Sequence, residues 1–250
     1  MQHGVPFMME TTQVSTPDGP MILHWARPVS PGPEKGLPGI LVFQEAFGVN
    51  PHIRRVCERL AAAGYLAVAP ELFHREGPGA EFGYDDFAKV RPVLERITNE
   101  MMLADILAAY GALRGDPAVG LDRTFCIGFC MGGFASILAA IHLPLAAAVS
   151  FYGGGITRAG PGIGFGPLLN DLGGLHCPTL HVFGEKDSSI LPEDIALLRS
   201  RLEELGKPFE VEVYPGAGHG FFCEDRAAYN PAAAEAAWKL ALEWLRLHVR

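Results

Sequence analysis

The sequence lacks an excess of positive charge, which narrows the partners the protein can have. Its 250 residues include 20 lysines and arginines against 28 aspartates and glutamates, so the formal net charge is −8. Proteins that bind nucleic acid usually concentrate basic residues on one face. The charge balance therefore argues against nucleic-acid binding, although an acidic chain can still contain a local positive pocket.

Long hydrophobic runs are also missing. No stretch reaches the ~18 consecutive apolar residues that suggest a membrane-spanning helix. Residues 1–7 lack the basic segment and the uninterrupted apolar segment of a secretory signal. We therefore expect a cytoplasmic protein that does not act at a membrane.

Cysteine is sparse, and its spacing is uninformative for disulfides or metals. The five cysteines are Cys57, Cys126, Cys130, Cys177 and Cys223. An odd number without a dense framework is not typical of a disulfide scaffold. The close pair Cys126 and Cys130 does not have the usual spacing of paired zinc ligands. From these patterns we expect neither a metal nor an organic cofactor.

What the chain does contain is enough apolar residues for a sizeable core, since 49% are hydrophobic and 19% charged. Its length suits one large α/β domain spanning residues 1–250. Short apolar runs alternate with helix-length segments from residue 39 onward. The expected strands are residues 39–43, 66–70, 124–127, 146–151, 179–183 and 209–214. The expected helices are residues 51–63, 84–113 with a break near Pro92, 134–141, 192–205 and 232–248.

This alternation predicts a mostly parallel sheet with helices on both faces. Residues 13–15 and 21–25 flank the turn Pro17-Asp18-Gly19, which predicts an antiparallel hairpin at one edge. The Pro- and Gly-rich residues 28–38 would join this hairpin to the parallel core. Residues 152–176 are too rich in glycine for regular structure, which leaves a surface loop or a flexible pocket wall as alternatives.

The strongest motif is the run GFCMGG at residues 128–133, which follows one predicted strand and opens a helix. This is the setting of a nucleophile elbow, G-x-nucleophile-x-G, in which a sharp turn pushes the nucleophile outward. Glycines at 128 and 132 give the turn room, and Cys130 occupies the nucleophile position. The Met131 amide would lie at a helix N-terminus, where it can face a developing oxyanion. The other cysteines, including the mid-strand Cys126, are expected to be buried fillers.

A cysteine nucleophile needs a base, and with this elbow the chain order is nucleophile, acid, histidine. His219 lies in the glycine-flanked run PGAGHGFF at residues 215–222, directly after the last predicted strand. That position favours His219 over His181, which lies within a strand, and over His248 near the C-terminus. His142 and His176 also follow the elbow, without such a setting.

The acid that orients the histidine is expected directly after an earlier strand. Asp187 lies there in the run GEKDSS at residues 184–189, with Glu185 as its close competitor and Asp194 inside the next predicted helix. After the first core strand comes FQEAFGVN at residues 43–50, whose Ala46 amide is expected to be the second oxyanion donor. Taken alone, Glu45 in this run would be an ordinary loop charge.

Together these motifs resemble the dienelactone hydrolase family of the α/β-hydrolase superfamily. The resemblance extends from Gln44 and Glu45 through the cysteine elbow to His219 and covers nearly the whole core. It implies an α/β-hydrolase fold and a triad in which Cys130 attacks, His219 transfers protons and Asp187 orients His219. It also implies that Glu45 contacts the resting thiol until substrate displaces it, which a like-charge effect on the thiolate would explain.

The sequence departs from the best-known members of that family, in which an arginine a few residues beyond the histidine binds a substrate carboxylate. Residues 220–223 contain no basic residue, and the sequence does not decide whether Lys89 or Arg91 in the mid-chain segment corresponds to another of the family's arginines. Phe221 and Phe222 indicate either a more apolar pocket or ordinary core packing.

These features predict a hydrolase of the carboxymethylenebutenolidase type that cleaves a small-molecule ester or lactone. A thioesterase or general carboxylesterase on the same triad is the first alternative. A non-catalytic ligand-binding or thiol-sensing protein is the second. The chain is expected to be a monomer or a small homo-oligomer.

Overall fold

The structure is a computed structural model that describes residues 6–29 and 35–249. Within these residues, one sheet has the strand order β1-β2-β4-β3-β5-β6-β7-β8. The strands are β1 (Phe7–Thr16), β2 (Gly19–Pro28), β3 (Leu37–Phe43), β4 (Leu66–Pro70), β5 (Val119–Phe129), β6 (Ala147–Phe151), β7 (Thr179–Gly184) and β8 (Phe209–Tyr214). The helices are α1 (Pro51–Ala62), α2 (Phe87–Arg96), α3 (Asn99–Gly115), α4 (Met131–His142), α5 (Pro192–Glu204) and α6 (Pro231–Leu247), with short 3₁₀ turns at His74–Glu76 and Leu172–Gly174.

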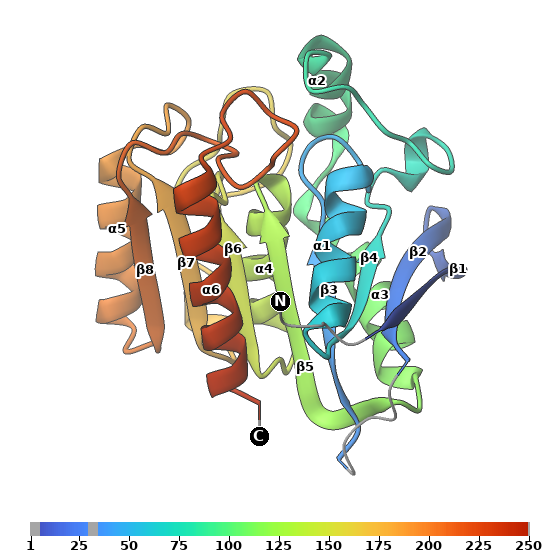
Figure 1. Ribbon diagram of the computed structural model, residues 1–250. Coiled ribbons are helices and arrows are strands. Elements are labelled where there is room, and N and C mark those ends of the chain that lie inside the picture. Colours follow the sequence, from blue (N-terminus) through green and yellow to red (C-terminus); the bar gives the residue numbers. More distant parts are fainter. Residues whose placement is uncertain (1–5, 30–34, 250) are drawn as a thin grey trace.

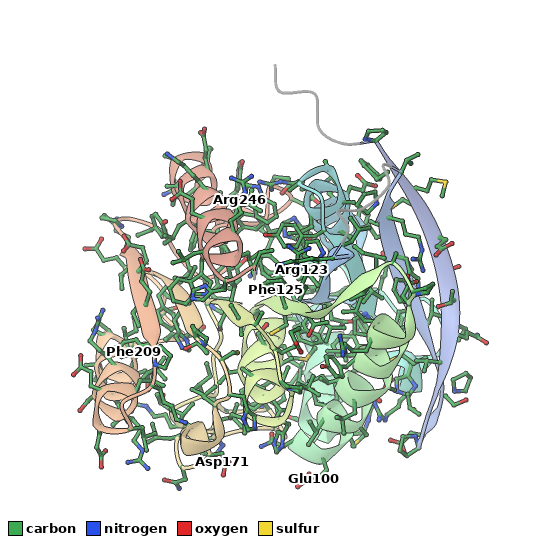
Figure 2. All side chains as sticks on the ribbon, turned by 90° about the horizontal axis from the view of Figure 1, so that it is seen from below. Glu100, Arg123, Phe125, Asp171, Phe209 and Arg246 are labelled. Atoms are coloured by element: carbon green, nitrogen blue, oxygen red, sulfur yellow. The ribbon has the colours of Figure 1, made fainter. Side chains whose placement is uncertain are left out.

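The predicted α/β-hydrolase architecture is confirmed. Strands β3 to β8 pair in parallel, whereas β1 and β2 form an antiparallel hairpin whose β2 also pairs antiparallel with β4. Helices α1 and α6 cover one face of the sheet, and α3, α4 and α5 cover the other (Figures 1 and 2). Parallel strands buried on both faces explain the continuous apolar runs in the sequence. Residues 1–5 and part of the predicted 28–38 connection lie outside the described residues.

The predicted break in the helical region 84–113 is misplaced. Pro92 lies inside α2, and the chain instead breaks after Arg96, where Ile97 and Thr98 take extended backbone angles. The hydroxyl of Thr98 accepts a hydrogen bond of 3.3 Å from the Met101 amide and caps α3. A new N-cap therefore sets the boundary, and the proline does not.

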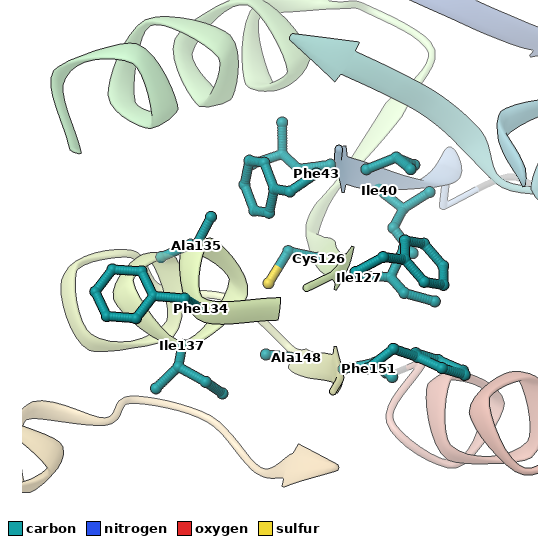
Figure 3. Close-up of a cluster of buried hydrophobic side chains, with 14 of the residues drawn as sticks. Ile40, Phe43, Cys126, Ile127, Phe134, Ala135, Ile137, Ala148 and Phe151 are labelled. Atoms are coloured by element: carbon teal, nitrogen blue, oxygen red, sulfur yellow. The ribbon is translucent and has the colours of Figure 1, made fainter. Parts of the chain in front are cut away.

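The core lies between the sheet and the two helix layers. Phe125 on β5 is buried at the centre of the view along the strands, while Glu100 and Asp171 lie at the periphery (Figure 2). Cys126 points toward α4 (Figure 3), where its thiol donates to the Ser136 carbonyl over 3.4 Å. Cys126 is therefore the buried filler that the sequence indicates.

The carboxyl ends of the parallel strands meet at one edge, the upper edge in Figure 1. Phe43 of β3 pairs in register with Gly128 of β5, so the loop that follows β3 and the elbow that follows β5 leave the sheet side by side. The segments after β6, β7 and β8 reach the same edge. In open α/β sheets this edge is where ligands bind. Among the described residues, no helix is long and apolar enough to cross a membrane.

Candidate active site

The turn between β5 and α4 holds Cys130 in a backbone conformation that few side chains adopt. Its φ is 55° and its ψ is −115°, in the region that normally favours glycine. A Cβ on Gly128 would overlap the Gly132 carbonyl, and a Cβ on Gly132 would overlap the Phe43 carbonyl. The glycines therefore let the elbow close against itself and against β3, and this close packing maintains the strained Cys130.

His219 connects Cys130 to Asp187. Its Nε2 lies 3.1 Å from Cys130 Sγ, and its Nδ1 lies 2.7 Å from Asp187 Oδ2. The three side chains come from the ends of β5, β7 and β8, so the sheet edge brings together residues far apart in sequence. The order nucleophile, histidine, carboxylate in space is that of an acyl-transfer triad.

Asp187 is buried and held rigidly by backbone groups. Its Oδ1 accepts hydrogen bonds from the amides of Ser189 and Ile190 at 2.8 and 3.1 Å, which leaves Oδ2 for His219. The competing acids lie elsewhere: Glu185 accepts from the Gly216 amide in an exposed turn, and Asp194 binds Thr157 and Arg158 at the start of α5.

The rejected histidine His181 is fully buried in β7, where Nε2 lies 3.0 Å from the Thr179 hydroxyl. Burial lowers the pKa of His181 to about 3, so this imidazole stays neutral. It packs within the core and does not reach the sheet edge. A histidine within a strand, such as His181, is therefore buried in the core, whereas a histidine after a strand, such as His219, reaches the sheet edge where Cys130 lies.

The surroundings of His219 favour its protonated form. Burial alone would lower the pKa of His219, but the Cys130 sulfur and the Asp187 carboxylate outweigh burial and raise the pKa to about 10. Tyr152 packs edge-on against the imidazole with ring centroids 5.2 Å apart. The site is therefore arranged to stabilise a protonated His219 beside the Cys130 sulfur.

Glu45 follows β3 at the same edge of the sheet, and its carboxylate is fully buried. Its Oε1 accepts a hydrogen bond of 3.0 Å from Arg226. The resemblance implied a contact between Glu45 and the resting thiol; here the carboxylate is paired with Arg226, and Cys130 Sγ lies against His219. The ion pair offsets the negative charge that Glu45 would otherwise place near the sulfur.

The sequence analysis did not identify Arg226 because it considered only residues 220–223 beyond His219. Arg226 lies seven residues after His219, and its guanidinium lies over the rings of Phe47 and Tyr84 at 5.4 and 5.9 Å. No local motif marks this arginine. The one available signal was the unexplained Glu45, because a buried carboxylate requires a positive partner.

The structure decides two points that the sequence left open. Phe221 and Phe222 are fully buried and pack against other core aromatics, so they are core residues. Lys89 and Arg91 are exposed on α2, where they pair with Asp86 and Glu95. The positive charge at the site comes from Arg226 instead.

A cavity of about 550 Å³ opens over Cys130 and His219. Cys130, His219, Arg226 and both expected oxyanion residues, Ala46 and Met131, line it. Residues of the glycine-rich 152–176 segment form part of its wall, namely Gly154, Gly155, Gly160, Pro161, Ile163 and Phe165. The volume lies in the range of small-molecule sites.

Known proteins resemble the chain over nearly its whole length. The profile of the dienelactone hydrolase family matches residues 26–249. A Synechocystis sp. protein provisionally named a carboxymethylenebutenolidase is 36% identical over 238 residues, which cover 92% of this chain and 94% of that protein. A Bradyrhizobium sp. protein provisionally named a 2-oxo-3-(5-oxofuran-2-ylidene)propanoate lactonase is 30% identical over 243 residues, covering 96% and 95%.

The same relationship holds in three dimensions. The crystal structure of a provisionally named dienelactone hydrolase from Klebsiella pneumoniae subsp. pneumoniae has a TM-score of 0.86 with this structure at 30% identity. The match covers 96% of this chain and 99% of the Klebsiella chain. The chain belongs to the dienelactone hydrolase family, whose members are hydrolases with the α/β-hydrolase fold.

Proposed function

We propose that the protein hydrolyses a small-molecule ester or lactone through an acyl-enzyme formed on Cys130. The observation that carries the proposal is the placement of His219 between Cys130 Sγ and Asp187, at 3.1 and 2.7 Å. Both distances are short enough for proton transfer and for orientation of the imidazole. The carboxymethylenebutenolidase and lactonase names of the relatives point to the same substrate class.

The first half of the reaction transfers the acyl group to sulfur. His219 Nε2 takes the thiol proton, and the thiolate attacks the carbonyl carbon to form a tetrahedral oxyanion. The oxyanion collapses, the C–O bond to the leaving group breaks, and His219 returns the proton to the leaving oxygen. The product is a thioester on Cys130 and an alcohol, which in a lactone stays attached to the acyl chain.

The second half regenerates the thiol. Water loses a proton to His219 and attacks the thioester carbonyl, and the thiolate leaves and recovers its proton. In both halves the amides of Met131 and Ala46 would donate to the oxyanion, since both residues line the cavity beside Cys130. Asp187 keeps the imidazole in the orientation that both transfers need.

The Glu45–Arg226 ion pair sets the resting state in this proposal. While Arg226 holds the carboxylate, the charge of Glu45 is partly offset and the Cys130–His219 pair can form. A substrate group that binds Arg226 must displace Glu45, and the displaced carboxylate must turn away from Cys130 for the thiolate to persist. Glu45 therefore acts as the gating acid, and Arg226 is the group from which a substrate would displace it.

The experiment is hydrolysis of a panel containing a dienelactone, an activated aryl acetate and an acyl thioester, combined with intact-protein mass spectrometry. We expect wild type to turn over at least one of them and to show an acyl adduct that maps to Cys130. Cys130→Ala should lose both turnover and adduct, whereas the matched control Cys126→Ala should keep both because Cys126 lies in the core.

Each outcome separates the alternatives. Preference for the lactone or aryl ester supports the proposal, and activity confined to the acyl thioester would identify a thioesterase on the same triad. An adduct that maps elsewhere, or that forms equally in Cys130→Ala, would contradict the assigned nucleophile. A folded wild type that turns over no panel member would favour a binding role.

A further inference from the structure

We propose that Glu45, His52 and Cys223 form a binding site for Zn²⁺ or a cation of similar chemistry, next to the triad and separate from it. Their ligand atoms lie within 4.8 Å of one another, and all three residues are buried. They come from the loop after β3, the first turn of α1 and the segment after β8. No spacing pattern connects them, so the sequence-based expectation of no metal could not include them.

Two atoms of the cluster are buried without a protein hydrogen bond. Within residues 6–29 and 35–249, Glu45 Oε2 and His52 Nε2 have no hydrogen-bond partner. Glu45 is 0% exposed and His52 is 1% exposed, so bulk water does not reach them. Buried polar atoms are nearly always satisfied by protein, water or an ion. One ligand that binds an oxygen and a nitrogen at once would satisfy both atoms.

The surrounding contacts orient the three ligands as metal sites usually do. His52 Nδ1 lies 3.0 Å from Glu224 Oε2, which leaves Nε2 for the cluster. A metal-bound histidine typically gives its other ring nitrogen to a carboxylate in this way. Arg55 in turn binds Glu224 at 2.7 Å, and Arg226 occupies only Oε1 of Glu45.

The donor set points to a borderline-soft divalent ion. One thiolate, one imidazole and one carboxylate are the ligands that Zn²⁺ takes in four-coordinate sites, with the fourth position left to water. The hydroxyl of Tyr84, 3.1 Å from Cys223 Sγ, holds the thiol in place.

The cation would bind with loss of the Cys223 thiol proton to solvent. It would also fix Glu45. If a substrate must displace Glu45 from Arg226, as proposed above, the bound ion would keep Glu45 in place and slow hydrolysis. This last consequence rests on the proposed function, whereas the binding itself does not.

The test is a Co²⁺ titration of the full chain in a Cys130→Ser background, which removes the catalytic thiol. Cobalt replaces zinc in such sites, and a cobalt–thiolate bond gives a charge-transfer absorbance. We expect one Co²⁺ per chain, displaced by Zn²⁺. Adding Cys223→Ser should abolish the charge-transfer band, and adding His52→Gln should weaken binding at least about tenfold. The matched control Cys57→Ser, a buried cysteine on α1, should leave the band unchanged.

A band that survives Cys223→Ser, or no binding at stoichiometric Co²⁺, would overturn the proposal and leave a bridging water as the ligand of Glu45 and His52. Circular dichroism of each variant shows whether it is folded. If Cys223→Ser does not fold, the Co²⁺ affinity of His52→Gln decides whether the proposal holds. The gating consequence has its own readout: Zn²⁺ inhibition of ester hydrolysis should weaken in His52→Gln. Metal binding without that change would reject the link to Glu45 and leave the site intact.

Discussion

Replacing Arg226 with methionine should destabilise the protein strongly, and mainly through Glu45. Methionine keeps most of the apolar stem that packs near Phe47 and Tyr84, but it removes the positive charge 3.0 Å from a fully buried carboxylate. Breaking a buried ion pair costs about 3–5 kcal/mol because one charge is left uncompensated. The Arg226 side chain is 19% exposed, so the lower end applies, about 3 kcal/mol. In a chain of this size that corresponds to a Tm lowered by about 6–12 °C.

The assay is thermal unfolding followed by circular dichroism for wild type, Arg226→Met and Arg226→Met with Glu45→Gln. Glu45→Gln should restore most of the lost stability, because it removes the uncompensated charge. A matched control is Arg91→Met, whose exposed pair with Glu95 should contribute less than about 1 kcal/mol. A deficit that Glu45→Gln does not reduce would refute the reasoning.

Three further outcomes follow from the triad and its elbow. Asp187→Asn should lower kcat roughly 10³- to 10⁴-fold, measured by steady-state ester hydrolysis, because the imidazole of His219 loses its orienting acceptor. Gly132→Ala should lower the free energy of unfolding by about 1–3 kcal/mol in urea titration, since the added methyl overlaps the Phe43 carbonyl. The proton NMR signal of His219, assigned by its absence in His219→Gln, should titrate near 10 and at lower pH in Cys130→Ala. Because this pKa is raised above the ~6.5 of an unfolded histidine, its stabilising contribution is full below ~6.5 and is lost as pH rises through about 10.

The fold could be predicted because its signals are local. A buried parallel strand reads as a short apolar run, and residues 66–70 match β4 at both ends. The edge strand β8 reads instead as alternating polarity, and residues 209–214 match it at both ends. The elbow is also local, because the close packing of Gly128 and Gly132 leaves a fixed spacing around Cys130. The helix break was misplaced because a proline can be accommodated within α2, whereas the capping bond of Thr98 is a property of the folded turn.

The residues around Glu45 could not be predicted because they are far apart in sequence. The distance in sequence from Glu45 to Arg226 is 181 residues, and neither residue has a motif that names the other. The same holds for His52 and Cys223, which meet Glu45 only because β3, α1 and the segment after β8 reach one edge of the sheet. Chain order constrains which strand end a residue occupies, but it does not specify which side chains turn inward there.

Glu45 belongs to both proposals, and this makes them interdependent. Its carboxylate has one oxygen bound to Arg226 and a second oxygen without a hydrogen-bond partner in the described part of the chain. A cation bound to that second oxygen would hold it at a metal–oxygen distance of about 2.0–2.2 Å. The carboxylate could then no longer move toward Cys130 or leave Arg226. A substrate that displaces Glu45 from Arg226 must therefore weaken cation binding, and by linkage the cation must weaken substrate binding by the same factor. Both proposed sites use the buried carboxylate of Glu45, so binding at one site would weaken binding at the other without any change in the fold.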